Sequence, residues 1–385
     1  ALMIGDGCAA NINLYLGWKD QDAADRIISH TVTLLLGAGV LVALLGSLFA
    51  RRIVLLFGAT STSFQAALDY TRVIVLGLPF LMFCSALTAI IRADGNPKFA
   101  MKAMMLGAAI NLLLDPLFIF GFHMGVRGAA LATVISQAFS CIWVLSFLFG
   151  KKTFLKLRKS TMKLKADIIL PCMALGSSLF VMQLSESVIS VCFNSSLLQY
   201  GGDIAVGAMT ILTSVMQFAM LPLQGLGQGA QPIISYNYGA RNEKRVRSTF
   251  KLLIKTSVSY SVILWLIIMI FPQIFAGMFT SDSTLLAFTK TALRIYMAVV
   301  FIFGIQIACQ MTFVSIGNAP CSIIVAILRK FVLLIPLIFI LPHILPDRTM
   351  AVYTAEPVAD TLAVIFTMVM FGTQFRKALK KLEEA

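Results

Sequence analysis

Apolar runs dominate this 385-residue chain: about ten stretches near 20 residues long carry almost no charge, the length a membrane-crossing helix needs. A backbone in lipid must satisfy its own hydrogen bonds, which only helices and closed barrels do, and the alternation typical of barrel strands is absent. The composition, 59% hydrophobic and 12% charged, leaves too few polar residues to cover a water-soluble surface. We therefore predict an all-α polytopic membrane protein.

Charged loops separate these stretches and give them an orientation. Most of the 31 lysines and arginines fall in alternate loops, so the net charge of +14 follows the positive-inside rule and needs no nucleic-acid partner. We predict that these loops and the C-terminus are cytoplasmic, in a plasma (inner) membrane. The basic loops are 17–30, 92–102, 150–167, 239–251, 329–330 and the tail from 376; the spans are 1–16 (partial), 32–56, 70–91, 99–122, 126–149, 168–193, 204–234, 252–278, 288–314, 321–345 and 352–375.

One carboxylate interrupts the apolar stretch NLLLDPLFIF, residues 111–120. An ionised acid at bilayer depth costs at least ~2.5–3.5 kcal/mol, so Asp115 is a candidate functional residue. Asn111, four residues earlier, lies on the same helix face, and Pro116 loosens the helix because it has no N–H. Such an acid can exchange a proton, or bind Na⁺ together with an amide oxygen; the alternative is a purely structural pair with Asn111 or a backbone donor.

The two halves of the chain repeat each other at an offset of about 222 residues. Gly17 matches Gly239, Lys19 matches Arg241, and Gly95-Asn96 matches Gly317-Asn318. The stretch around Pro116 returns around Pro336, without the acid. Matching loops lie on one side, so we predict parallel repeats: two six-helix lobes, with 1–150 as the amino lobe, 151–167 as a cytoplasmic linker and 168–385 as the carboxy lobe. The same offset predicts that the first helix and part of the second are absent here.

Several motifs together resemble the multidrug and toxic compound extrusion (MATE) family. They are the glycine-rich segments that end in GWK and GAR, RADGNPK, NLLLDPLFIFG, GAALATVISQ and EPVADTLA. The stretch VMQLSESVISVCFNSSLLQYGGDIAVGAM resembles the MepA-like subgroup. The resemblance implies a cation-coupled multidrug efflux antiporter that exports cationic amphipathic compounds by alternating access. It also implies that Asp115 and Asn111 form the H⁺ or Na⁺ coupling site.

Other polar residues inside the spans are weighed against structural roles. Glu186 and Gln183, three residues apart, are candidates for a substrate or a second coupling ion, against a merely solvated acid. For Asp360 an interfacial cap or charge pair is preferred. Asp6 is a candidate cavity residue, and Arg92 and Asp94 are read as structural. The glycines at 5, 7, 225, 227 and 229 are expected to permit close helix packing.

Other functions and partners are weighed in the same way. A lipid-intermediate or polysaccharide flippase of the same superfamily should have a basic cavity, whereas the basic residues here are predicted to lie outside the spans. An intramembrane enzyme is disfavoured, since no Walker loop, G-x-S-x-G or H-E-x-x-H is present. The seven cysteines and three histidines show no metal-ligand spacing, so we predict no cofactor. We expect a monomer whose partners are small cationic drugs, H⁺ or Na⁺, and membrane lipids.

Overall fold

The computed structural model describes residues 1–56, 64–150, 153–157 and 165–383, and helices make up almost all of them. No strand occurs in these ranges. The first helices are α1 (Leu2–Gly17), α2 (Gln21–Leu56), α3 (Phe64–Ala93), α4 (Pro97–Pro116), the π-helix η1 (Leu117–Gly121) and α5 (Gly125–Leu148). The others are α6 (Ala166–Gly239), α7 (Glu243–Ile270), α8 (Pro272–Gly277), α9 (Ser283–Tyr296), the 3₁₀-helix η3 (Val300–Ile302), α10 (Phe303–Ser315), α11 (Ala319–Ile327), the π-helix η4 (Leu328–Leu334), α12 (Ile335–Ile344) and α13 (Arg348–Glu383).

The spans follow the predicted order. Eight helices in the described ranges are long and apolar enough to cross a membrane, and α9 with η3–α10, bent by 42°, makes a ninth. The predicted spans 168–193 and 204–234 both lie in α6, whose backbone breaks at Gly202, where φ is 65°. Helix α2 begins at Gln21 rather than 32, because helices continue past the end of an apolar run. The prediction of an all-α polytopic membrane protein is confirmed.

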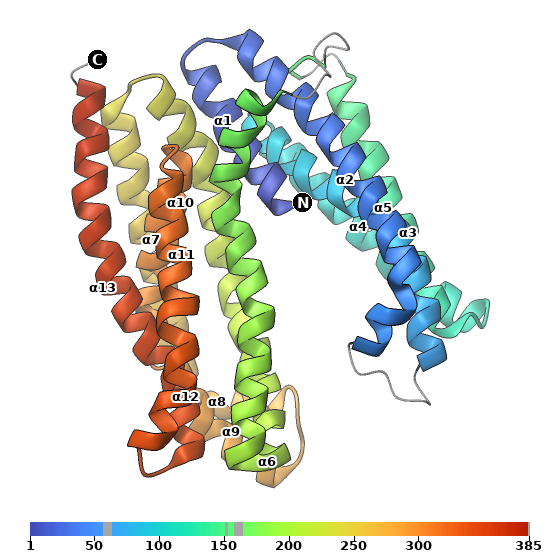
Figure 1. The fold of residues 1–385 in the computed structure, drawn as a ribbon, viewed down its shortest axis with the longest axis vertical. Coiled ribbons are helices and arrows are strands. Elements are labelled where there is room, and N and C mark those ends of the chain that lie inside the picture. The colour runs from blue at the N-terminus through green and yellow to red at the C-terminus, as the bar shows by residue number, and fades with distance from the viewer. Residues whose placement is uncertain (57–63, 151–152, 158–164, 384–385) are drawn as a thin grey trace. The chain divides into compact units, whose positions relative to one another are not determined.

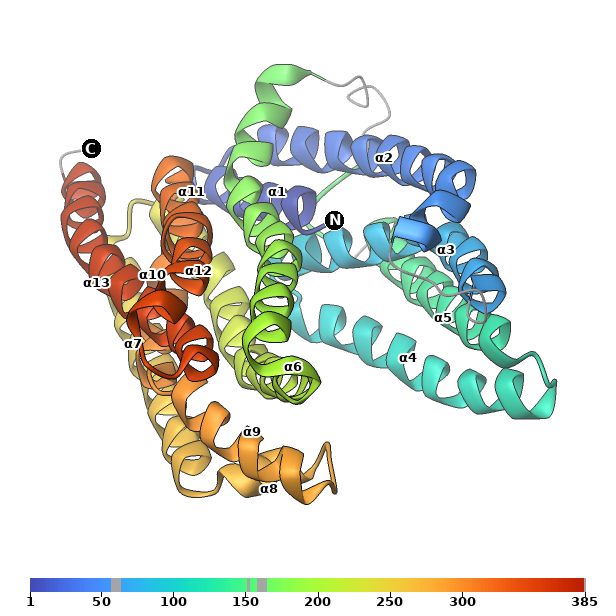
Figure 2. The ribbon, with the colours of Figure 1, turned by 60° about the horizontal axis from the view of Figure 1, so that its bottom comes forward.

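The chain forms two compact units, Ala1–Gly176 and Ser177–Ala385, so that the first turns of α6 belong to the first unit. The core of the first unit is made by α1, α2, α3 and α5, with Ile12, Ile28 and Leu87 fully buried. Helix α4 packs on α5 at the edge of this unit (Figures 1 and 2). Only 6% of its most apolar window is buried, which leaves the helix carrying the predicted coupling acid largely uncovered within its unit.

The second unit has an aromatic core. Helices α7, α10 and α13 run side by side in it (Figure 1). The rings of Phe250 and Phe371 stack with centroids 4.7 Å apart, and Phe313 packs edge-on against Phe371 at 5.1 Å. Such aromatic pairs bury large apolar areas and prefer these offset and edge-on geometries. This core holds α13, the helix that carries two of the buried charges described below.

The internal repeat appears in the turns as well as in the sequence. Lys19 and Arg241 are both left-handed, with φ of 63° and 55°, and so are Gly95 and Gly317, with φ of 83° and 78°. The backbone hydrogen bonds that close each pair of turns join the same positions, offset by 222 residues. A left-handed backbone is uncommon for a lysine or an arginine, so its recurrence at matched positions supports a duplicated unit.

Close packing at glycines is confirmed at some of the named positions. A Cβ on Gly5 would lie 2.6 Å from the Ala86 Cα, and one on Gly7 would overlap the Cys172 carbonyl oxygen. The backbone of α1 therefore contacts the backbones of α3 and of the first turns of α6. At Gly225 and Gly229 no atom of the described residues lies within 4 Å of an added Cβ, so the prediction was wrong there.

Candidate functional site

Asp115 lies one residue before a proline that changes the helix type. Pro116 has no N–H to donate, and the chain continues as the π-helix η1, in which the Phe122 amide bonds the Leu117 carbonyl at 2.9 Å. Such π segments often occur at functional sites because the wider turn reorients side chains. The regular α-helix therefore ends directly after Asp115 and Pro116.

The predicted pairing of Asn111 with Asp115 is present. The Asn111 Nδ2 lies 3.4 Å from the Asp115 Oδ1 and 3.5 Å from the hydroxyl of Thr133 on α5. Both side chains are half-buried. The distances are at the long end for hydrogen bonds, so the contacts are weak. Thr133 was not singled out from the sequence, because a contact between different helices leaves no periodic signal within either one.

Asp115 has neutral neighbours. In the part of the chain that the structure describes, no Lys, Arg or His comes within salt-bridge distance of its carboxylate. The carboxylate is therefore available to a proton or an external cation. The Asn111 amide nitrogen faces the acid, so proton exchange fits the arrangement directly. Na⁺ binding requires Asn111 to turn its carbonyl oxygen inward, since hard cations take oxygen ligands.

The second predicted site acid, Glu186, is exposed on α6 and has a cationic partner. Its Oε1 lies 3.0 Å from the Nζ of Lys330, and its side chain is 58% exposed. Gln183, one turn earlier on α6, is exposed too. Although Lys330 is buried, the Glu186 carboxylate itself is exposed, so solvent screens its attraction to the ammonium and leaves Glu186 able to exchange its partner.

Arg329 and Lys330 were predicted to form a cytoplasmic basic loop, and that prediction is wrong. Both lie in the π-helix η4 and are buried, at 7% and 4% exposure. Two acids on one face of α13, Glu356 and Asp360, are 2% exposed and compensate them. The predicted span 321–345 already contained both bases, and buried carboxylates offset much of the cost of bringing these charges into the bundle.

These four residues form one ion cluster with short contacts. The Arg329 Nε lies 2.7 Å from the Asp360 Oδ1 and its Nη2 lies 3.5 Å from the Glu356 Oε1. The Lys330 Nζ lies 3.6 Å from the same Glu356 oxygen. Of the two roles preferred for Asp360, the charge pair is the one the structure shows, but it is buried rather than interfacial. We refer to Glu186, Arg329, Lys330, Glu356 and Asp360 as the carboxy-half cluster.

Helix α10 lines the same region with side chains that were not singled out from the sequence. The ring centroid of Phe303 lies 4.3 Å from the Arg329 guanidinium carbon. The Nε2 of Gln310 lies 3.0 Å from the sulfur of Met182, and Met182 lies one turn before Glu186 on α6. Gln306 lies between Phe303 and Gln310 on that face. Neither of its buried amide atoms has a hydrogen-bond partner among the described residues. The amide therefore has unused hydrogen-bonding capacity inside the bundle.

Asp6, Arg92 and Asp94 have structural contacts. Asp6 is buried, with its Oδ1 3.2 Å from the Arg92 Nη2, so α1 is tied to α3. The Asp94 Oδ1 accepts the backbone N–H groups of Phe154 and Leu155 at 3.0 and 3.2 Å, which fixes the start of the linker to the first unit. Burial raises the pKa of the Asp94 carboxyl, and these hydrogen bonds oppose the rise.

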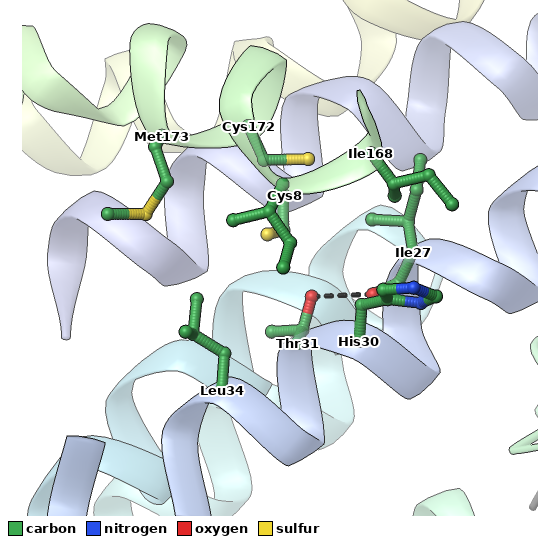
Figure 3. A pocket seen from close by; sticks show the side chains of 9 residues that line it. Cys8, Ile27, His30, Thr31, Leu34, Ile168, Cys172 and Met173 are labelled. Atoms are coloured by element: carbon green, nitrogen blue, oxygen red, sulfur yellow. Dashed lines mark hydrogen bonds between the residues drawn. The ribbon is translucent and has the colours of Figure 1, made fainter. Parts of the chain in front are cut away.

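A small pocket between α1, α2 and the start of α6 carries two cysteines. Cys8 and Cys172 face it together with His30, and the Thr31 hydroxyl donates to the Ile27 carbonyl oxygen at 2.7 Å (Figure 3). All seven cysteines are free thiols. Among the described residues no group of three or more His, Cys, Asp or Glu is placed to hold a metal ion.

Comparisons with known proteins agree with the motifs. The MatE family model matches residues 2–117 and 178–340. The multidrug export protein MepA of Staphylococcus aureus (strain N315) is 26% identical over 339 residues, which are 88% of this chain and 74% of that protein.

Solved structures share the fold. A crystal structure of MATE in the bent conformation superposes with a TM-score of 0.93 at 23% identity, over 99% of this chain and 85% of that one. An outward-facing multidrug resistance MATE family transporter of the MOP superfamily gives 0.91 at 24% identity, over 100% and 85%. At this identity the likeness establishes the fold, and the roles of individual residues rest on the geometry above.

Proposed function

Because the chain belongs to the MatE family of transporters, as its motifs predicted, we propose that it is a multidrug efflux antiporter coupled to H⁺ or Na⁺. The observation that carries the coupling role is the Asp115 carboxylate, which has only neutral polar neighbours in the described chain. A group that must bind and release an ion in each transport cycle cannot be permanently neutralised by a tethered base. Asp115 meets that condition and Asp360 does not.

The proposed substrates are cationic, amphipathic compounds, the class for which an apolar wall and a loosely held acid are suited. Glu186 is the proposed acid in the carboxy half, with Gln183 beside it on α6. The name of the staphylococcal relative, a multidrug export protein, supports this choice. We place the protein in the plasma membrane with its C-terminus on the cytoplasmic side, acting as a monomer.

A flippase for a lipid-linked anion is the competing transporter function. Arg329 and Lys330 are buried in the second unit, so not all basic residues lie outside the spans. Those two cations face three carboxylates, Glu186, Glu356 and Asp360, so the carboxy-half cluster carries a net charge of about −1 when all are ionised. A site with excess negative charge disfavours a pyrophosphate, and the exporter remains the better proposal.

Ethidium transport into inside-out vesicles, with pH and Na⁺ gradients imposed separately, tests the proposal. We expect one of the two gradients to drive uptake, and D115N to reduce it at least about tenfold, because an amide cannot exchange a proton or neutralise Na⁺. The matched control is D69N, which removes a carboxylate paired at 2.9 Å with the exposed Arg127 and should leave uptake unchanged. Full gradient-driven uptake by D115N would remove Asp115 from the coupling mechanism.

A further inference from the structure

Lys330 contacts two carboxylates that differ in accessibility. Its ammonium lies 3.0 Å from Glu186, whose side chain is 58% exposed, and 3.6 Å from Glu356, whose side chain is 2% exposed. The lysine itself is buried, at 5% side-chain exposure. The shortest contact of this buried cation is therefore made to the one acid of the cluster that a ligand can reach.

The rest of the cluster provides a second position for the same ammonium. Asp360 is committed to Arg329 at 2.7 Å, while Glu356 is shared between Arg329 and Lys330 at 3.5 and 3.6 Å. The second carboxylate oxygen of Glu356 is buried and has no hydrogen-bond partner among the described residues. If Glu186 is taken by another cation, Lys330 keeps a buried counter-charge with an unused acceptor atom. Its displacement therefore leaves no charge unpaired in the bundle.

We propose that Lys330 is a tethered cation that occupies the substrate position on Glu186, so that a lipophilic cation binds there only by displacing the ammonium toward Glu356. Lys330 is then a specificity-determining residue. A cation that interacts with Glu186 less favourably than the Lys330 ammonium does cannot displace it. Lys330 therefore excludes weakly interacting cations from the site. Quaternary cations are the most affected, because they have no N–H to replace the charged hydrogen bond that Lys330 donates.

This inference rests on the proposed role of Glu186 in substrate binding, and a double-mutant cycle separates the two. The probe is tetraphenylphosphonium, and its dissociation constant is measured by equilibrium dialysis on the purified full chain in detergent. The proteins are the native chain, E186Q, K330Q and E186Q/K330Q. K255Q is the control because Lys255 lies exposed on α7, outside the carboxy-half cluster. A cycle isolates the coupling of two residues when each single change removes only their interaction.

We expect K330Q to tighten tetraphenylphosphonium binding about tenfold, because the competing cation is gone. E186Q should change the affinity of the native protein less than about twofold and weaken that of K330Q about tenfold. K255Q should bind as the native protein does.

Two results overturn the inference and are distinguishable. If E186Q weakens binding by the same factor with and without Lys330, Glu186 binds the cation without displacement, so the tethered-cation inference fails while the proposed function stands. If E186Q has no effect in either background, the substrate role of Glu186 fails as well. Should K330Q not fold, K330Q/E356Q, which replaces the buried pair by two neutral amides, takes its place in the cycle with the same expectations.

Discussion

The two copies of the repeated proline element show opposite ways of handling charge. In the first copy, an acid precedes Pro116; the Asn111 amide lies 3.4 Å from that acid, and the Thr133 hydroxyl lies 3.5 Å from the same amide. In the second copy, Pro336 has no acid before it, and two bases upstream, Arg329 and Lys330, are matched by carboxylates. Each copy contains a π-helix, η1 after Pro116 and η4 ending just before Pro336.

The contrast separates a site that can cycle from one that mainly holds structure. A charge without an internal counter-charge must obtain one from outside, which is what coupling to an ion requires. A fully paired buried charge contributes to a defined arrangement of helices, and removing one partner is costly. Within the carboxy-half cluster only Glu186 is exposed, so only there does the second copy offer a charge to ligands.

The largest effect is expected from removing the centre of the carboxy-half cluster. R329M leaves Glu356 and Asp360 buried with one base fewer, and we expect a loss of about 3–5 kcal/mol in unfolding free energy. Thermal unfolding in detergent measures it. The triple variant R329M/E356Q/D360L, which removes the unpaired charges as well, should recover most of the loss. If R329M unfolds as the native protein does, the cluster is not structural.

A smaller effect is expected at the first copy. N111L removes the amide that donates to Asp115, and such a hydrogen bond contributes about 1 kcal/mol, or about fivefold in the affinity for the coupling ion. Gradient-driven ethidium uptake as a function of pH and of Na⁺ concentration measures the shift. T133V deletes only the more distant hydroxyl and should shift the curve less. Equal shifts for both variants would contradict the larger contribution expected of the Asn111 amide.

The smallest effect should follow removal of the exposed acid. E186Q is expected to change the unfolding free energy by no more than about 1 kcal/mol, because the Glu186 side chain is exposed and the buried Lys330 retains Glu356. E356Q, two per cent exposed and shared by two bases, should cost more, about 1–3 kcal/mol. Thermal unfolding of the two variants side by side checks the order. The reverse order would contradict the division into a loosely held and a structural acid.

Much of this arrangement could be predicted from the sequence, because it depends on local pattern. The lengths of the apolar runs predicted the helices. Helix periodicity predicted that Asn111 and Asp115 lie on one face. The offset of the repeat predicted matched turns at Gly95 and Gly317. What could not be predicted depends on contacts between helices: Thr133 reaches Asn111 from α5, and Arg329 finds Asp360 on a helix 31 residues later. The pattern of basic loops placed these two adjacent bases in a loop, although the acids four residues apart in EPVAD were a signal that partners exist.

We propose that Asp115 holds the coupling ion, and the ion released when substrate binds tests this role directly. Tetraphenylphosphonium is added to the purified protein in weakly buffered detergent solution, and a pH indicator and a Na⁺-selective electrode record the release. The native protein should release either protons or Na⁺ in proportion to the cation bound, and D115N should release neither. If D115N releases as much of the ion as the native protein does, Asp115 does not hold the coupling ion.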